Sequence, residues 1–144
     1  MSTDLSATSS VTWYAMSDDD LPTAKEIIAT HDEIEDEYDL KHTGAAVAAP
    51  RLKIKRLLDD IEEGDRYHRA AQLLRDLLTS HFFEDANKRT SWATTLRYFD
   101  QYDETPAETG DRVPKILRRL RRYDVDEIAE WLETGEIDEE RLEP

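Results

Sequence analysis

Cysteine is absent from this 144-residue sequence, so neither a disulfide nor a thiolate metal site can form. Long apolar runs are absent too, and none approaches the roughly 18 residues that a helix needs to cross a bilayer. The first twenty residues lack a basic segment followed by an apolar one, which is the pattern of a secretory signal. We therefore predict a cytoplasmic protein that does not contact a membrane.

Positive charge is also scarce. The chain has 19 Lys and Arg against 34 Asp and Glu, which gives a net charge of -15. Binding to a phosphate backbone requires concentrated Lys and Arg, so this balance argues against nucleic acid as the main partner. The simplest interpretation is a solvated acidic surface. A halophilic protein is a further hypothesis, because salt would screen the self-repulsion that opposes a compact state.

Alternating strand patterns and internal repeats are lacking as well, whereas six segments carry apolar residues at helical spacing. The first begins at Pro22, which suits a first helical position, and runs to Tyr38. The apolar residues of the other five fall within 54–61, 67–78, 92–99, 113–120 and 125–132. Asp65 and the sequence from Asp124 to Glu127 resemble helix caps, and Gly135 follows the last pattern.

Six helical patterns with short links predict an all-α, single-domain bundle over residues 21–144, preceded by a flexible acidic arm at 1–20. The segment 67–78 is the most apolar, so we expect it to be the central helix. In the segment after it, Trp92, Leu96 and Phe99 are spaced at i, i+4 and i+7. This spacing predicts that all three face the core.

The break between those two helices contains the most informative residues. His81 is expected at the end of the central helix and could serve as a general base near neutral pH. Asp85 could hold Mg²⁺ that bridges phosphate oxygens. Asn87, Lys88 and Arg89 then open a helix whose N–H groups and positive dipole end attract an anion. Taken alone, His81, Asp85 or Asn87 is more simply interpreted as a residue that ends or caps a helix. Together, at this spacing, they favour group transfer from a nucleotide.

The stretch 81–90 resembles the active-site loop of the Fic/Doc superfamily, whose pattern is H-x-F-x-[D/E]-[G/A]-N-[G/K]-R. Every specified position matches, with Phe83 expected to pin the loop to the core. The resemblance covers about residues 22–134 and implies an all-helical fold. It also implies that His81 is catalytic, that Asp85 binds Mg²⁺, and that the nucleotide phosphates are bound by Ala86, Asn87, Lys88 and Arg89.

The sequence Ala-Asn-Lys-Arg-Thr is similar to the Doc (death-on-curing) branch of that superfamily. The Fic branch has Gly-Asn-Gly-Arg and a second arginine three residues later, where this chain has Trp92. The resemblance links that arginine to AMP transfer and links Lys88 to an inverted nucleotide that presents its γ-phosphate. It therefore implies a toxin that uses ATP and Mg²⁺ to phosphorylate a Ser or Thr hydroxyl.

Two partners follow from the same resemblance: an antitoxin protein, and a translation elongation factor as the target. The alternatives are a Fic-type protein AMP transferase and a non-enzymatic helical module that binds a partner. Residues 40–50 lie where the family has a flap that binds target backbone by strand addition. Their Ala-rich sequence suits close approach but lacks a β-branched run, so the flap and a plain loop both remain open.

The other histidines are interpreted as non-catalytic. His31 lies within the first amphipathic pattern and is predicted to be structural. His42 and His68 are predicted to be surface residues. The spacing of these three does not match that of metal ligands.

Overall fold

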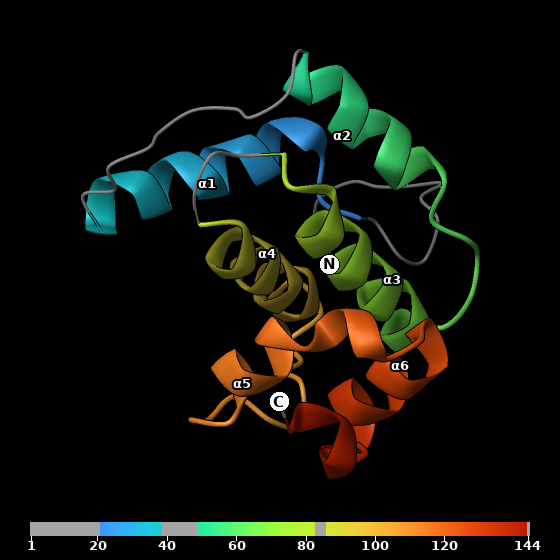
Figure 1. Ribbon diagram of the computed structural model, residues 1–144. Coiled ribbons are helices and arrows are strands. Elements are labelled where there is room, and N and C mark those ends of the chain that lie inside the picture. Colours follow the sequence, from blue (N-terminus) through green and yellow to red (C-terminus); the bar gives the residue numbers. More distant parts are fainter. Residues whose placement is uncertain (1–20, 39–48, 83–85, 144) are drawn as a thin grey trace, which may run out of the picture.

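A computed structural model of the chain describes residues 21–38, 49–82 and 86–143. This part contains six α-helices, two short 3-10 helices and no strand. In Figure 1, α1 (Ala24–Tyr38) and α2 (Pro50–Asp59) lie on one side of α3 (Arg66–Ser80) and α4 (Asn87–Asp100). On the other side lie α5 (Val113–Arg118) and α6 (Val125–Thr134). The predicted all-α bundle of six helices is confirmed.

Helix α3 is central, as its apolar sequence predicts. It packs against α2, α4 and α6, and against the 3-10 helix η1 (Leu120–Arg122). Its buried side chains are Ala70, Ala71, Leu73, Leu74, Leu77 and Leu78. The predicted cap is also present, because the Asp65 side chain accepts a hydrogen bond of 2.9 Å from the backbone N–H of His68.

Helix α1 begins two residues later than Pro22, the position predicted from sequence. Thr23 and Glu26 form a reciprocal cap: Thr23 Oγ1 accepts from the Glu26 N–H (3.1 Å), and Glu26 Oε1 accepts from the Thr23 N–H (2.8 Å). This pair satisfies two backbone donors that the first turn would otherwise leave free. Pro22 therefore precedes the cap, and the side-chain cap decided where the helix starts.

The buried face of α4 differs from the one predicted. Phe99 is fully buried, but Trp92 and Leu96 are only partly buried. The buried positions are instead Thr90, Ser91, Thr94, Thr95, Tyr98 and Phe99. Hydroxyls enter this core because several bond within the helix: Ser91 Oγ donates to the Asn87 carbonyl (2.7 Å) and Thr95 Oγ1 to the Ser91 carbonyl (2.8 Å).

The C-terminal part follows the predicted signals. The Asp124–Glu127 capping box opens α6, and Gly135 ends it with a positive φ of 84°. The short η2 helix (Glu139–Leu142) then buries Leu142. Of the helices in the described ranges, none is long and apolar enough to cross a membrane.

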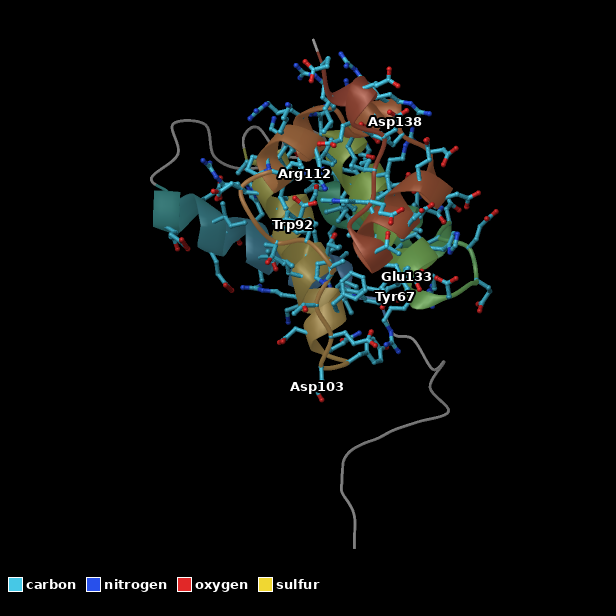
Figure 2. All side chains as sticks on the ribbon, turned by 90° about the horizontal axis from the view of Figure 1, so that it is seen from below. Tyr67, Trp92, Asp103, Arg112, Glu133 and Asp138 are labelled. Atoms are coloured by element: carbon cyan, nitrogen blue, oxygen red, sulfur yellow. The ribbon has the colours of Figure 1, made fainter. Side chains whose placement is uncertain are left out.

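A network of aromatic and charged side chains joins this part to α4. Trp131 of α6 is fully buried and stacks on Trp92, with ring centroids 5.6 Å apart. Its indole N–H donates to Glu108 (2.9 Å), whose carboxylate also accepts from Arg112. Arg112 in turn donates to the Gly135 carbonyl (2.9 Å). Trp92 and Arg112 are labelled in Figure 2.

Candidate active site

His81 lies where the sequence predicts it, at the C-terminal end of the central helix. Helix α3 ends at Ser80, and His81 caps it in the left-handed conformation, with φ 50° and ψ 54°. This conformation is uncommon for a residue other than glycine, although histidine adopts it more often than most. The His81 side chain is exposed, and Phe82 directly after it is buried in the core. Phe82 therefore anchors the start of the loop.

Helix α4 opens at Asn87, also as predicted, so that Asn87, Lys88 and Arg89 form its first turn. Ala86 precedes it as a second left-handed residue, with φ 62° and ψ 24°, and is buried. A small residue suits that position, since a positive φ strains bulky side chains and there is little space.

Some of the predicted features concern residues that the structure does not describe. Phe83 and the predicted metal ligand Asp85 lie outside the described residues, so the role of Asp85 stays a prediction. The same holds for the arm at 1–20 and for most of the segment 40–50. The end of that segment is described, and Pro50 is the first residue of α2.

A pocket of about 750 Å³ joins the predicted residues. Its walls come from the end of α3, the first turn of α4, and the α5–η1 segment. His81, Ala86, Asn87, Lys88 and Arg89 all line it. The volume falls in the range that is typical of small-molecule sites. All the predicted site residues that the structure describes therefore meet at one cavity.

Two further residues of this pocket were missed at the level of sequence. Arg118 of α5 and Arg121 of η1 line the same cavity. Arg121 Nη2 donates a hydrogen bond of 2.5 Å to His81 Nε2. Because a guanidinium can only donate, His81 is neutral in this contact and carries its proton on Nδ1. The available signal was the concentration of four arginines within residues 118–122 of an acidic chain.

The pocket is positively charged although the chain is strongly acidic. Lys88, Arg89, Arg118 and Arg121 line it, and no Asp or Glu of the described residues does so. Within the described part of the chain, Lys88 and Arg118 have no ion-pair partner. The acidic side chains of the described residues lie elsewhere; Asp103 and Asp138, for example, lie at opposite ends of the molecule in Figure 2. Such an arrangement attracts an anion to this cavity.

The first turn of α4 is tied to α1 by His31. This side chain is only 1% exposed, and its Nδ1 lies 3.0 Å from Thr90 Oγ1, while its Nε2 lies 3.3 Å from Glu35. The predicted structural role of His31 is therefore confirmed. Its contact with Thr90 fixes the residue that follows Arg89.

The remaining histidines agree with the sequence analysis where they are described. His68 is exposed and bonds to Asp65 (2.9 Å) and Asp126 (3.1 Å), and the hydrogen bond with Asp65 is the main reason that its pKa is raised. His42 lies outside the described residues. Across the described ranges, no group of three or more His, Asp and Glu could hold a metal ion.

Comparison with known families decides the classification. The model of the Fic/DOC family matches residues 18–99, which is more than half of the chain. The chain belongs to the Fic/DOC family. The matched region includes His81 and the first turn of α4, whereas Arg118 and Arg121 lie beyond it. Fic/DOC proteins are generally transferases that use nucleotide substrates with Mg²⁺. No curated protein matches the sequence.

Proposed function

We propose that this Fic/DOC protein is a Doc-like toxin of a toxin–antitoxin pair that transfers the γ-phosphate of ATP to a Ser or Thr hydroxyl of a protein. The observation that carries this proposal is the cationic pocket in which His81 meets the first turn of α4. Its lining fits a polyphosphate, because four cations and no described carboxylate face the cavity. A translation elongation factor is the target that the family resemblance suggests.

The proposed reaction assigns one role to each group. His81 accepts the proton of the hydroxyl, whose oxygen attacks the γ-phosphorus. The bond from that phosphorus to the β–γ bridging oxygen breaks, and ADP leaves with the electron pair. Lys88, Arg89 and the N–H groups of α4 offset the phosphate charge, while Asn87 orders the phosphates. Mg²⁺ held by Asp85 would neutralise further charge when bound.

The choice of the γ-phosphate rests on two side chains. Lys88 lines the pocket at a position where the AMP-transferring branch has glycine, so its side chain occupies space near the phosphate loop. Trp92 stands where that branch has its second arginine, and its stacking on Trp131 fixes it in the pocket wall. Both departures favour a nucleotide that presents its γ-phosphate.

One observation favours the alternative of a Fic-type AMP transferase. Arg118 and Arg121 bring two cations to the pocket and could replace the arginine that is missing at Trp92. In that reaction the hydroxyl oxygen attacks the α-phosphorus and pyrophosphate leaves. The third alternative, a non-enzymatic binding module, would retain the fold and transfer neither group.

The experiment that separates these functions is incubation of the protein with host lysate and ATP labelled at either the α or the γ position. We expect label from the γ position alone, and a target heavier by one phosphoryl group. The reaction should stop in His81→Ala and continue in Lys115→Ala, an exposed residue of α5 outside the pocket. Label from the α position would establish AMP transfer, and no label at all would favour the binding module.

Nucleotide affinity gives a second measurement. Asp85→Ala and Arg89→Ala should each weaken binding of Mg·ATP by roughly one to two decades, because a charged phosphate contact contributes about 1.5–3 kcal/mol. Unchanged affinity in both variants would contradict the phosphate site.

Location, partner and domain organisation are part of the same proposal. We propose a cytoplasmic location, an antitoxin partner that neutralises the protein, and a flexible arm at residues 1–20 before the helical domain at 21–144. Expression should arrest growth, and His81→Ala should relieve the arrest. Co-expression with the product of an adjacent reading frame should relieve it too, and a neighbouring frame without that effect would contradict the antitoxin.

A further inference from the structure

We propose that Arg118 and Arg121 form a second wall of the phosphate site, and that Arg121 passes from His81 to the phosphate chain when a nucleotide binds. This inference rests on the proposed function, because it concerns the same pocket. It adds two binding residues and a link between substrate binding and the freeing of the base.

The positions of Arg118 and Arg121 support a second phosphate-binding wall. Arg118 and Arg121 line the same pocket as the motif residues Lys88 and Arg89, but from another segment, which the family match does not include. Their spacing of three residues, at the passage from α5 into a 3-10 turn, allows both side chains to share one side of the backbone. Arg122 serves another purpose, since it donates to the backbone carbonyls of Arg141 and Glu143.

The positive charge in the pocket also favours a polyphosphate ligand. Four cations line it, and within the described residues neither Lys88 nor Arg118 has an ion-pair partner. Yet this chain has 34 acidic residues with which Arg118 could pair, and among the described residues it pairs with none. A triphosphate carries several negative charges and can accept paired hydrogen bonds from guanidinium groups. Two cationic walls therefore fit a polyphosphate chain held between them.

The contact between Arg121 and His81 links nucleotide binding to the availability of the base. Arg121 Nη2 donates to His81 Nε2, so this nitrogen is occupied and cannot accept a proton from an incoming hydroxyl. A phosphate oxygen carries negative charge, so it can form with the Arg121 guanidinium an ion pair with paired hydrogen bonds, which a neutral imidazole cannot offer. A phosphate within reach would therefore draw Arg121 away from the imidazole. His81 would become available as a base only when the nucleotide is present.

The first experiment is calorimetric titration with Mg·ATP and Mg·GTP. Arg118→Ala and Arg121→Ala should each weaken binding by about tenfold, and equally for both nucleotides, because the phosphates are common to them. Arg121→Lys retains the positive charge on a long side chain and should lose less. Lys115→Ala removes the same charge from α5 outside the pocket and should change affinity by less than about twofold. Thermal unfolding of each variant checks that it folds.

The second experiment is NMR of ¹⁵N-labelled histidine, which reports the tautomer of His81. The protein without nucleotide should show the proton on Nδ1 and an acceptor at Nε2. Addition of Mg·ATP without an acceptor protein should change the His81 signals toward those of Arg121→Ala. A purely structural contact between Arg121 and His81 would leave them unchanged.

The outcomes separate this inference from the proposed function. If the parent protein binds no Mg·ATP, both fail. If Arg89→Ala weakens binding while the two arginine variants match Lys115→Ala, the second wall is refuted and the proposed function stands. If the arginine variants weaken binding but Mg·ATP leaves the His81 signals unchanged, the passage of Arg121 is refuted.

Discussion

Trp131→Phe tests the network that supports the pocket wall. Trp131 is fully buried, stacks on Trp92 at an interplanar angle of 28°, and donates its indole N–H to Glu108. Phenylalanine retains one aromatic ring but removes the N–H and part of the buried volume. Glu108 loses one donor, although Arg112 still bonds to it.

The expected loss of stability can be built from these contacts. The hydrogen bond to a carboxylate should contribute about 1.5–3 kcal/mol. The void left by the smaller ring should cost ~1 kcal/mol, and the weaker stacking on Trp92 roughly 0.5 kcal/mol. The variant should therefore lose about 3–4.5 kcal/mol of unfolding free energy. At roughly 2–4 °C per kcal/mol for a chain of this size, the melting temperature should fall by about 10 °C.

The assay is urea unfolding followed by far-UV circular dichroism, with Trp92→Phe as the matched control. Trp92 is only partly buried, so the same substitution there should cost no more than ~1 kcal/mol. A double-mutant cycle with Glu108→Gln should give a coupling of at least about 0.5 kcal/mol. The reasoning is refuted if Trp131→Phe costs no more than Trp92→Phe.

Four other predictions concern hydrogen bonding and charge. Thr90→Val should cost about 1–3 kcal/mol in urea unfolding, because it removes the hydroxyl at His31 Nδ1. Thr94→Val should be neutral or stabilising, since in the described structure the buried Thr94 Oγ1 has no hydrogen-bond partner; an equal loss in both would contradict this. Hydrogen bonds from Arg112, then from Trp131, outweigh the effect of burial and hold the pKa of Glu108 below its ordinary 4.5. The stabilisation by ionised Glu108 is therefore complete above about pH 4.5 and is lost as the pH falls through its lowered pKa. In acid, the melting temperature should fall less for Glu108→Gln than for the parent protein. If the acidic surface is an adaptation to high salt, added KCl should raise the melting temperature, and an unchanged value would oppose the halophilic hypothesis.

Local chemistry explains why much of the fold could be predicted from sequence. Asp65 and Asp124 cap helices by bonding to backbone three residues away, and Gly135 ends α6 by adopting a positive φ. These signals act within one turn, so they need no knowledge of the packing. His81 and Asn87 were placed correctly for the same reason, because the motif marks the end of one helix and the start of the next.

Packing decided the faces that the helices bury. The apolar spacing on α4 predicted a stripe through Trp92 and Leu96, yet the buried face carries Thr90, Ser91 and Thr94. Threonine and serine are not distinguished as core residues by hydrophobicity, and only the positions of α1 and α3 around α4 show that these hydroxyls lie inside. Trp131 lies within the apolar pattern at 125–132, but its contacts with Trp92 and Glu108 arise only in the folded chain.

The amino-acid sequence by itself determined the helix positions, the motif at the break between α3 and α4, and the type of chemistry that its residues can perform. Tertiary structure alone decided which other residues join them. Arg121 lies 40 residues from His81, and their contact exists because α3 packs against η1 and α6. Helical periodicity describes which residues share a face of one helix, and it carries no information about which distant segment meets the end of another. The cationic wall of Arg118 and Arg121 therefore became visible only in the folded chain.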